Sequence, residues 1–503
     1  MLNKNILLNG VLSGIVGLTL FLTGCGGGSG SGVSPNPNPN PNPQTGNFFK
    51  YNRISIAGSS ITHGDIENSA NEGEGYLGEK SYVGEVEKYF REERADTIGP
   101  DELVNAKETD DEPMSYQGKI KVYGSGTVLQ GTLKASDTIS IVYAGSNVKT
   151  TIEMDVDGQK FEYTIPAGIY LPVKKTFDDT NVNFYKAFRE NNPKAVKTWK
   201  LSKNEKHTFT LTVKEGELHL NFITNHMYYF QNAGVGGFEA LDFLSENRQH
   251  STVNDIIAFD PDLFIFESST NDAKTWATEI ALRNGTSGEA PSTNQWILEE
   301  PVVFQSNGMN ITLNQAVSVQ KGDVVIMGDY NGDIQNMAVG IVLSNSNRRD
   351  ISLAKIISYA GQNVTEVNAV PQNIVEKCRI KRIRIWEDRV KEVIQKVQNG
   401  VGHKITVGIG TSGVPNYYDP EKGDPYTQQP FTPRRLLGYR ERGQEIASEN
   451  GWFFVDFFKR ILKVEPGVDV DHKWTYGDNT HPNDPGRVYF GEAVISALQP
   501  YLK

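Results

Sequence analysis

The chain has little cysteine and no excess of positive charge. Cys25 and Cys378 are its only cysteines among 503 residues, so at most one disulfide can form and a disulfide scaffold is excluded. Asp and Glu number 61 against 50 Lys and Arg, which gives a formal net charge of −11. Proteins that bind a phosphate backbone need a basic face. The charge balance therefore argues against a nucleic-acid partner, while the length allows a large buried core.

A mostly apolar stretch stands near the start of the sequence, from Ile6 to Leu22, after the positively charged Lys4. This order of segments is typical of an export signal. A transmembrane anchor is the alternative, but the stretch is short for one and Asn9 interrupts it. We therefore expect an exported protein and exclude this segment from the fold.

The sequence Leu-Thr-Gly-Cys at residues 22–25 resembles the lipobox of bacterial lipoproteins. The resemblance implies a signal peptide and lipobox over residues 1–25, and a lipid anchor in the cell envelope at Cys25. Gly26 provides no inner-membrane retention signal of the Asp type, so we expect the outer membrane if the cell has one. Cys378 is then expected to be a lone, buried thiol.

Residues 26–47 form a segment that is rich first in Gly and Ser and then in alternating Pro and Asn. The first composition gives a flexible coil and the second a stiffer, extended spacer, and neither can build a core. We expect a linker that holds the folded part away from the membrane.

Two regions, residues 113–225 and 298–372, are rich in runs where apolar and polar residues alternate. Alternation with a period of two predicts half-buried β-strands. Asp157-Gly158 and Glu215-Gly216 stand between such runs, as hairpin turns do. We expect a β-sandwich-like insertion in the first region and a second β-rich insertion in the other.

The remaining segments, residues 48–112, 226–297 and 373–503, alternate between strand and helix patterns. A long amphipathic helix is expected from Cys378 to Gln398. Repeated βα units predict an α/β fold with a parallel sheet and helices on both faces. In such sheets the functional site lies beyond the carboxyl ends of the strands.

The turns after the expected strands contain the residue types that acyl transfer needs. They read Gly-Ser-Ser-Ile-Thr at 58–62, Asn-Ala-Gly-Val-Gly-Gly at 232–237, Asn-Asp at 271–272 and Asp-Asn-Thr-His-Pro-Asn at 478–483. A serine nucleophile needs a base, a carboxylate can orient that base, and N–H donors must stabilise the oxyanion. The four turns supply one group of each kind.

In this order the four blocks resemble those of the SGNH (GDSL-like) hydrolases. The resemblance implies a flavodoxin-like three-layer α/β/α sandwich, here interrupted by the two β-rich insertions. It also implies a carboxylic-ester hydrolase that uses no metal and no organic cofactor. The blocks are short and lie in the part of the chain outside the insertions, about 280 of the 503 residues. The insertions have no counterpart in the plain family core.

By the same resemblance, Ser60 is the nucleophile, His481 is the base and Asp478 orients it. The oxyanion hole consists of the Ser60 N–H, Gly237 and Asn271. One position departs from the family pattern, because Ser59 stands where an Asp is usual.

Three neighbouring residues compete for these roles. Ser59 is the alternative nucleophile, but the register of the motif favours Ser60. His472 also follows an Asp by three residues, but only His481 is followed by Pro482 and a short lead into the last helix. His63, three residues after Ser60, is expected to line the substrate site.

The sequence predicts a cell-envelope serine esterase whose substrate is an acylated polysaccharide, most simply a carbohydrate O-acetylesterase. A non-catalytic surface protein that binds glycans or serves in assembly on the same fold is the alternative from another class. Lipase and thioesterase activities also stay open, although no long exposed apolar lid stands out. The assignment of a sugar substrate rests on analogy with other β-sandwiches.

Overall fold

The computed structural model describes residues 49–64, 81–111, 116–176, 188–236, 238–244, 251–269, 272, 296–319, 321, 323–328, 336–360, 363–381, 384–411, 432–457 and 481–502. The predicted signal peptide, the lipidation site Cys25 and the linker at 26–47 lie outside the described residues. Residues 48–503 cluster as one unit by their internal contacts. No described helix is both long and apolar enough to cross a membrane.

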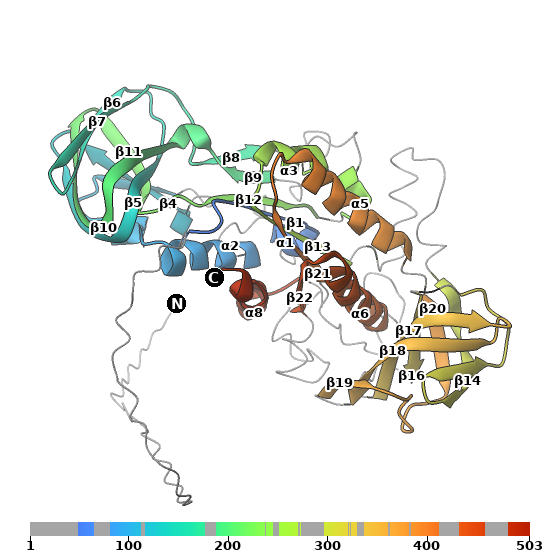
Figure 1. Ribbon diagram of the computed structural model, residues 1–503. Coiled ribbons are helices and arrows are strands. Elements are labelled where there is room, and N and C mark those ends of the chain that lie inside the picture. Colours follow the sequence, from blue (N-terminus) through green and yellow to red (C-terminus); the bar gives the residue numbers. More distant parts are fainter. Residues whose placement is uncertain are drawn as a thin grey trace, which may run out of the picture. The chain divides into compact units, whose positions relative to one another are not determined.

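A seven-stranded mixed sheet takes its five parallel strands from the segments with alternating strand and helix patterns (Figure 1). Its five parallel strands lie in the order β22, β21, β13, β1, β12. Their bounds are Arg53–Gly58 for β1, Tyr229–Gly234 for β12, Leu263–Ser268 for β13, Thr406–Thr411 for β21 and Phe453–Val455 for β22. Along the chain this order is 2-1-3-4-5, so the chain leaves β1 toward one neighbour and later returns to the other. A crevice at the carboxyl ends of β1 and β13 is the usual consequence.

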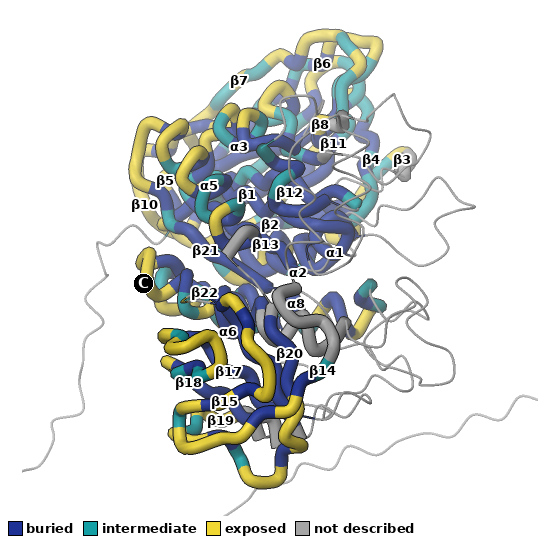
Figure 2. The backbone as a smooth tube through the Cα atoms, turned by 90° about the vertical axis from the view of Figure 1, so that its right-hand side faces the viewer, coloured by how far each residue is buried: buried dark blue, intermediate teal, exposed yellow. Residues whose placement is uncertain are grey.

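Alternating side chains of the central strands pack against helices on opposite faces. Ile54 and Ile56 join one apolar cluster with residues of two helices, and Ala57 joins another with residues of three. The first face is covered by α2 (Tyr82–Lys88), which continues as a π-helical turn (Tyr89–Arg94), and by α8 (Asp484–Leu498); the second by α3 (Val253–Phe259), α5 (Arg384–Gly400) and α6 (Thr432–Asn450). Both faces of β1 and β13 are therefore buried (Figure 2).

Two antiparallel strands extend this sheet beyond β12. They are β8 (Val173–Thr176) and β9 (Phe188–Asn191), and both come from the first β-rich region. The side chain of Asn191 accepts a hydrogen bond from the Phe230 N–H at 2.6 Å and so ties β9 to β12. The predicted α/β fold with parallel strands is confirmed, but the sheet as a whole is mixed because of these two strands.

The rest of the first β-rich region, together with β2 and β3 just before it, forms one antiparallel sheet of eight strands in the order β3-β4-β11-β5-β10-β6-β7, with β2 paired to β11. The strands are β2 Thr97–Ile98, β3 Glu108–Asp111, β4 Lys119–Gly124, β5 Val128–Ala144, β6 Thr150–Val156, β7 Gln159–Ile165, β10 Val196–Glu215 and β11 Glu217–Thr224. Alternate residues of these strands, such as Ile139, Ile141 and Leu211, face a common apolar core. The period-two pattern thus reflects one buried face per strand.

The second β-rich region, together with residues 377–381, forms a closed β-barrel. Its sheet runs β15-β14-β20-β16-β17-β18-β19, and the additional pairing of β15 with β18 closes the ring. The strands are β14 Trp296–Asn307, β15 Asn310–Leu313, β16 Val324–Gly328, β17 Asn336–Ser346, β18 Asp350–Ala360, β19 Asn363–Val367 and β20 Lys377–Lys381. Closure removes exposed strand edges from the ring.

Strand β20 corrects the predicted helix from Cys378 to Gln398, because the helix α5 begins only at Arg384. Cys378 and Ile380 alternate with polar neighbours and point into the barrel core, between β14 and β16. Hydrogen bonding to a strand on each side therefore overrides the helix propensity of these residues. Cys378 is buried and not in a disulfide, and burial raises the pKa of its thiol.

Short helical turns complete the described structure. They are α1 (Ser60–His63) and the 3-10 turns Pro100–Glu102, Tyr116–Gly118, Pro193–Ala195, Asp242–Leu244 and Gln499–Tyr501. Of these, α1 follows β1 directly and carries the predicted nucleophile.

Candidate active site

Ser60 lies at the first turn of α1, where the chain leaves β1. Ser59 caps this helix, since its Oγ accepts a hydrogen bond from the Ile61 N–H at 3.3 Å. Gly64 ends it with a φ of 94°, a left-handed conformation that glycine adopts without strain. The tight turn presents Ser60 at the carboxyl end of β1, which is the edge where a site is expected in this topology.

His481 brings the far end of the chain to this serine. Its Nε2 lies 2.8 Å from the Ser60 Oγ, although the two residues are 421 positions apart. A histidine nitrogen at this distance can take the hydroxyl proton as the oxygen attacks a carbonyl carbon. Ser60 is 6% exposed. The predicted pairing of Ser60 with His481 therefore has the geometry of a nucleophile and its base.

His481 is held just before helix α8. The side chain of Asn483 caps this helix by accepting a hydrogen bond from the Gly486 N–H at 3.1 Å. Pro485 stands in the first turn, where its missing N–H costs nothing. A rigid helix start two residues downstream limits the positions that the imidazole can take.

Glu267 is a buried carboxylate beneath the nucleophile turn that the sequence analysis missed. It is the fifth residue of β13 and is 0% exposed. Its Oε2 accepts hydrogen bonds from the Ser59 N–H at 2.8 Å, the Ser59 hydroxyl at 2.9 Å and the Thr62 hydroxyl at 2.7 Å. The available signal was a single acid within the apolar run LFIFES at 263–268.

Tyr82 extends this hydrogen-bond chain from helix α2. Its hydroxyl lies 2.7 Å from the Thr62 Oγ1. Because Thr62 donates its only hydroxyl proton to Glu267, the Tyr82 hydroxyl is the donor in this pair. Burial and the negative charge of Glu267 together raise the pKa of Tyr82, which keeps the phenol protonated as a donor.

The end of β12 packs directly against α1. The Asn232 side chain donates to the Thr62 carbonyl at 3.0 Å and accepts from the Gly234 N–H at 2.9 Å. A Cβ on Gly234 would collide with the backbone of His63, so only glycine permits this approach. The segment that leads to the predicted oxyanion residue Gly237 thus starts beside the nucleophile turn.

Asp272 ties the loops after β12 and β13 together. Its Oδ2 accepts from the Ser268 hydroxyl at 2.8 Å and its Oδ1 from the Ala240 N–H at 3.2 Å. Burial raises the pKa of Asp272 to about 6. Ser269, just before the predicted oxyanion residue Asn271, has a φ of 129°, which is rare for a residue other than glycine. Such backbone strain is common at functional sites.

Three of the predicted site residues, Gly237, Asn271 and Asp478, lie outside the described residues, as does the competing His472. Their roles therefore stay predictions. His63 is 0% exposed, so its predicted place along the substrate has no support in its exposure. Among the described residues, no group of three His, Cys, Asp or Glu side chains is arranged to hold a metal ion.

Comparisons with known proteins give no match to any family model and none to a curated protein. Among solved structures, a peptidoglycan O-acetylesterase is similar with a TM-score of 0.31 and 12% identity, over 90% of this chain and 91% of that one. An acetylxylan esterase from Geobacillus stearothermophilus gives a TM-score of 0.27 and 11% identity, over 54% and 73%. An α/β hydrolase from the metagenome of Lake Arreo, Spain, gives 0.26 and 12%, over 54% and 72%. Likenesses this low carry no argument about the activity of this chain.

Proposed function

We propose that this chain is a serine esterase of the SGNH-like type, which hydrolyses carboxylic esters through an acyl-enzyme. The observation that carries the proposal is the 2.8 Å approach of His481 Nε2 to Ser60 Oγ. The 2-1-3-4-5 order of the parallel strands and the helices on both sheet faces support the flavodoxin-like three-layer arrangement of that family.

In the proposed reaction the Ser60 oxygen attacks the ester carbonyl carbon while its proton passes to His481 Nε2. The tetrahedral intermediate collapses, and the leaving alcohol takes that proton from His481. Water then attacks the acyl-enzyme, gives its proton to His481, and the acid leaves as Ser60 regains its hydrogen. Asp478 would orient His481, and the N–H groups of Ser60 and Gly237 with the Asn271 side chain would stabilise the oxyanion.

The proposed substrate is an O-acetylated polysaccharide outside the cytoplasm. The low exposure of Ser60 favours a short acyl group over a long one. The motif at residues 22–25 supports export and a lipid anchor at Cys25, with the outer membrane as the proposed location where the cell has one.

The test uses the soluble chain from Phe48 onward, which forms one unit. We expect hydrolysis of para-nitrophenyl acetate to fall by at least 1,000-fold in Ser60→Ala and His481→Ala, as nucleophile and base removal do elsewhere. His472→Ala is the control and should keep full activity. Longer acyl esters should react more slowly than acetate, and the reverse order would favour a lipase.

A wild-type protein that is inert toward all of these esters would contradict the proposal. Binding to acetylated and deacetylated glycans would then be measured, because a non-catalytic glycan-binding protein is the alternative on the same fold. Full activity in Ser60→Ala would show that this serine is only part of a turn.

A further inference from the structure

The three donors that meet at Glu267 come from both sides of the proposed nucleophile. The Ser59 N–H and hydroxyl precede Ser60, and the Thr62 hydroxyl follows it by two residues. Each donor lies between 2.7 and 2.9 Å from the same carboxylate oxygen. The backbone on either side of Ser60 is therefore fixed to one point on β13.

We propose that Glu267 is a positioning residue that holds the turn at 59–62 so that the Ser60 hydroxyl points at His481. This inference rests on the proposed function, in which Ser60 and His481 do the chemistry. Glu267 touches neither reacting atom. It acts through Ser59 and Thr62, from the strand β13 that pairs directly with β1.

The packing around Gly58 shows how closely the turn is fitted to this carboxylate. A Cβ at Gly58 would collide with both the Thr62 hydroxyl and the Glu267 carboxylate. The backbone of β1 thus runs directly against the pair, with no room for a side chain. The hydrogen-bonded turn and the carboxylate form a single close-packed unit rather than a loop beside a strand.

The negative charge matters because one oxygen accepts three hydrogen bonds at short distances. Bonds to an ionised acceptor are shorter and roughly twice as strong as those between neutral groups. The Tyr82 hydroxyl, which donates to Thr62, polarises the Thr62 hydroxyl toward the carboxylate. A neutral amide at position 267 keeps the size of the side chain and weakens all three bonds.

The test measures kcat and KM for para-nitrophenyl acetate in Glu267→Gln. We expect kcat to fall by about 10- to 100-fold, the usual effect of removing a partner that orients a reacting side chain, while KM changes less than about twofold. Ser59→Ala and Thr62→Val should each lower kcat less than Glu267→Gln. Because all three act as one unit, Thr62→Val should cost less in the Glu267→Gln background than in the wild type.

Two matched controls separate positioning from a general loss of stability. Glu87→Gln changes another buried carboxylate that accepts hydrogen bonds, but from Arg91 and from Arg189 of β9. Ser55→Ala removes another buried hydroxyl of β1, which donates to Gln231 at 2.6 Å. Both controls should lower the unfolding temperature and leave kcat within about twofold of the wild type below that temperature.

Crystal structures of the wild type, Glu267→Gln and Glu267→Ala give a readout that needs no activity. We expect the distance from Ser60 Oγ to His481 Nε2 to exceed hydrogen-bonding range in at least the alanine variant, or in the glutamine variant if the alanine variant does not fold. A distance that stays near 2.8 Å in every folded variant would overturn the proposal, as would an unchanged kcat. A wild type that does not hydrolyse esters would instead contradict the proposed function. The distance from Ser60 Oγ to His481 Nε2 in the variants would then be the only test of the role of Glu267.

Discussion

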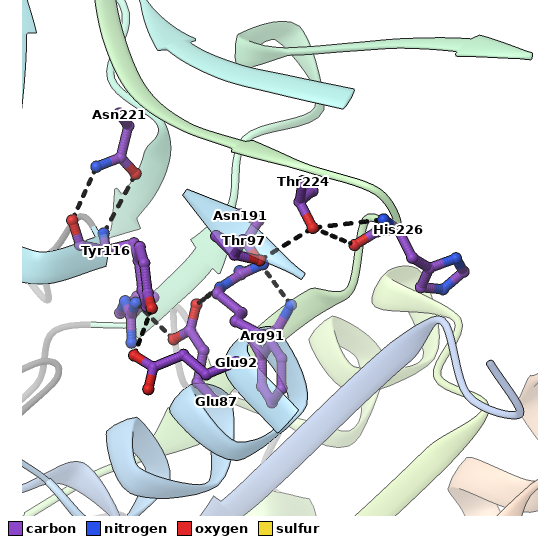
Figure 3. Close-up of polar contacts among 11 residues, drawn as sticks. Glu87, Arg91, Glu92, Thr97, Tyr116, Asn191, Asn221, Thr224 and His226 are labelled. Atoms are coloured by element: carbon purple, nitrogen blue, oxygen red, sulfur yellow. Dashed lines mark hydrogen bonds and ion pairs between the residues drawn. The ribbon is translucent and has the colours of Figure 1, made fainter. Parts of the chain in front are cut away.

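The two β-rich regions are joined to the sheet domain by different chemistry, with buried ion pairs added to apolar contacts at the first and apolar packing at the second. At the first, the buried Glu87 carboxylate of α2 is paired with two arginines, of which Figure 3 labels Arg91. Its Oε1 accepts from Arg91 Nη2 at 2.6 Å, and its Oε2 accepts from Arg189 Nη2 of β9 at 2.8 Å. The Arg91 guanidinium also lies 4.5 Å from the ring centre of Phe222 in β11. One ionic cluster thus connects a helix with strands of two sheets.

The second region is joined by apolar packing. Ile326 of β16 and Val339 of β17 lie in the same apolar cluster as Trp386 of α5 and Tyr439 of α6. Their neighbours in sequence, such as Val325, point into the barrel core instead. Each of these strands is therefore buried on both faces, one face in the barrel and the other in the joint.

The two joints should respond differently to substitution. Buried charges are costly to remove from water, so an ionic joint is stable only when each partner is in place. An apolar joint has no direction and accepts changes that conserve volume. We infer that the first joint fixes one geometry and depends on pH, whereas the second depends mainly on buried volume.

The largest expected effect is that of Glu87→Ala. Removal of the carboxylate leaves Arg91 and Arg189 buried without their charge partner, which typically costs about 3–5 kcal/mol. Hydrogen exchange should rise in β9 and β11, and the barrel strands β16 and β17 should stay protected. Equal exchange in both regions would contradict the separation of the joints. Glu217→Ala, which breaks the exposed pair with Lys107, is the control and should have little effect.

The matching change at the apolar joint is Ile326→Ala. Truncation of a buried isoleucine leaves a cavity and typically costs about 2–5 kcal/mol. Exchange should rise in β16 and β17 first, with β9 and β11 unaffected. Leu343→Ala, at a half-exposed position of β17, should cost much less. A similar loss from both substitutions would show that Ile326 adds nothing to the joint.

The first joint should weaken in acid because of His226, which follows β11. Burial lowers the pKa of His226 to about 4, and its ring stacks on Phe49 at 4.0 Å between ring centres. His226 binds a proton near pH 6.5 in the unfolded chain but only near pH 4 in the folded chain. Its contribution to the free energy of unfolding is therefore fully present above pH 6.5, decreases as the pH falls, and is lost below pH 4. The loss is about 3 kcal/mol over this window.

The variant His226→Phe keeps an aromatic ring for the stack and removes the titration. Urea denaturation at pH 7, 5.5 and 4 should show a flatter decline in this variant than in the wild type. Glu87 acts in the same direction at lower pH. Burial alone would raise the pKa of Glu87, but Arg189 and Arg91 hold it below its ordinary value. Its contribution is therefore present above about pH 4.5 and lost below it. If the free energy of unfolding declines equally with pH in His226→Phe and in the wild type, His226 is excluded as the source of the acid sensitivity.

The smallest expected effects come from exchanging valine and threonine, once between β2 and β11 of the first β-rich sheet and once at the apolar joint. Thr97→Val removes the hydrogen bond from the Thr97 hydroxyl to Thr224, 3.0 Å long, and should cost about 1 kcal/mol. Val339→Thr adds a hydroxyl to the apolar joint and should cost about 1–3 kcal/mol. Denaturant midpoints measure both. A stabilising effect of Thr97→Val would contradict a polar role for this position, and a stabilising effect of Val339→Thr would contradict an apolar one.

The sequence was informative wherever a residue stood in a local pattern. The glycine and serines after the buried run at 53–58 predicted the turn that carries Ser60, and the lead into the last helix distinguished His481 from His472. Glu267 had no such pattern, because a single acid in an apolar run does not reveal its partners. Strand β20 was missed because it is short and gains its pairing from β14 and β16, which are distant in sequence.

By itself, the sequence determined the alternation of strands and helices, the two β-rich regions and the residue types at the strand ends. These follow from periodicity and turn chemistry, which act over a few neighbouring residues. The tertiary structure alone decided that Glu267 lies under the nucleophile turn, that β8 and β9 extend the sheet, and that buried ion pairs help to join one β-rich region while apolar packing joins the other. These features depend on contacts between residues tens to hundreds of positions apart, and a local sequence pattern does not reveal such contacts.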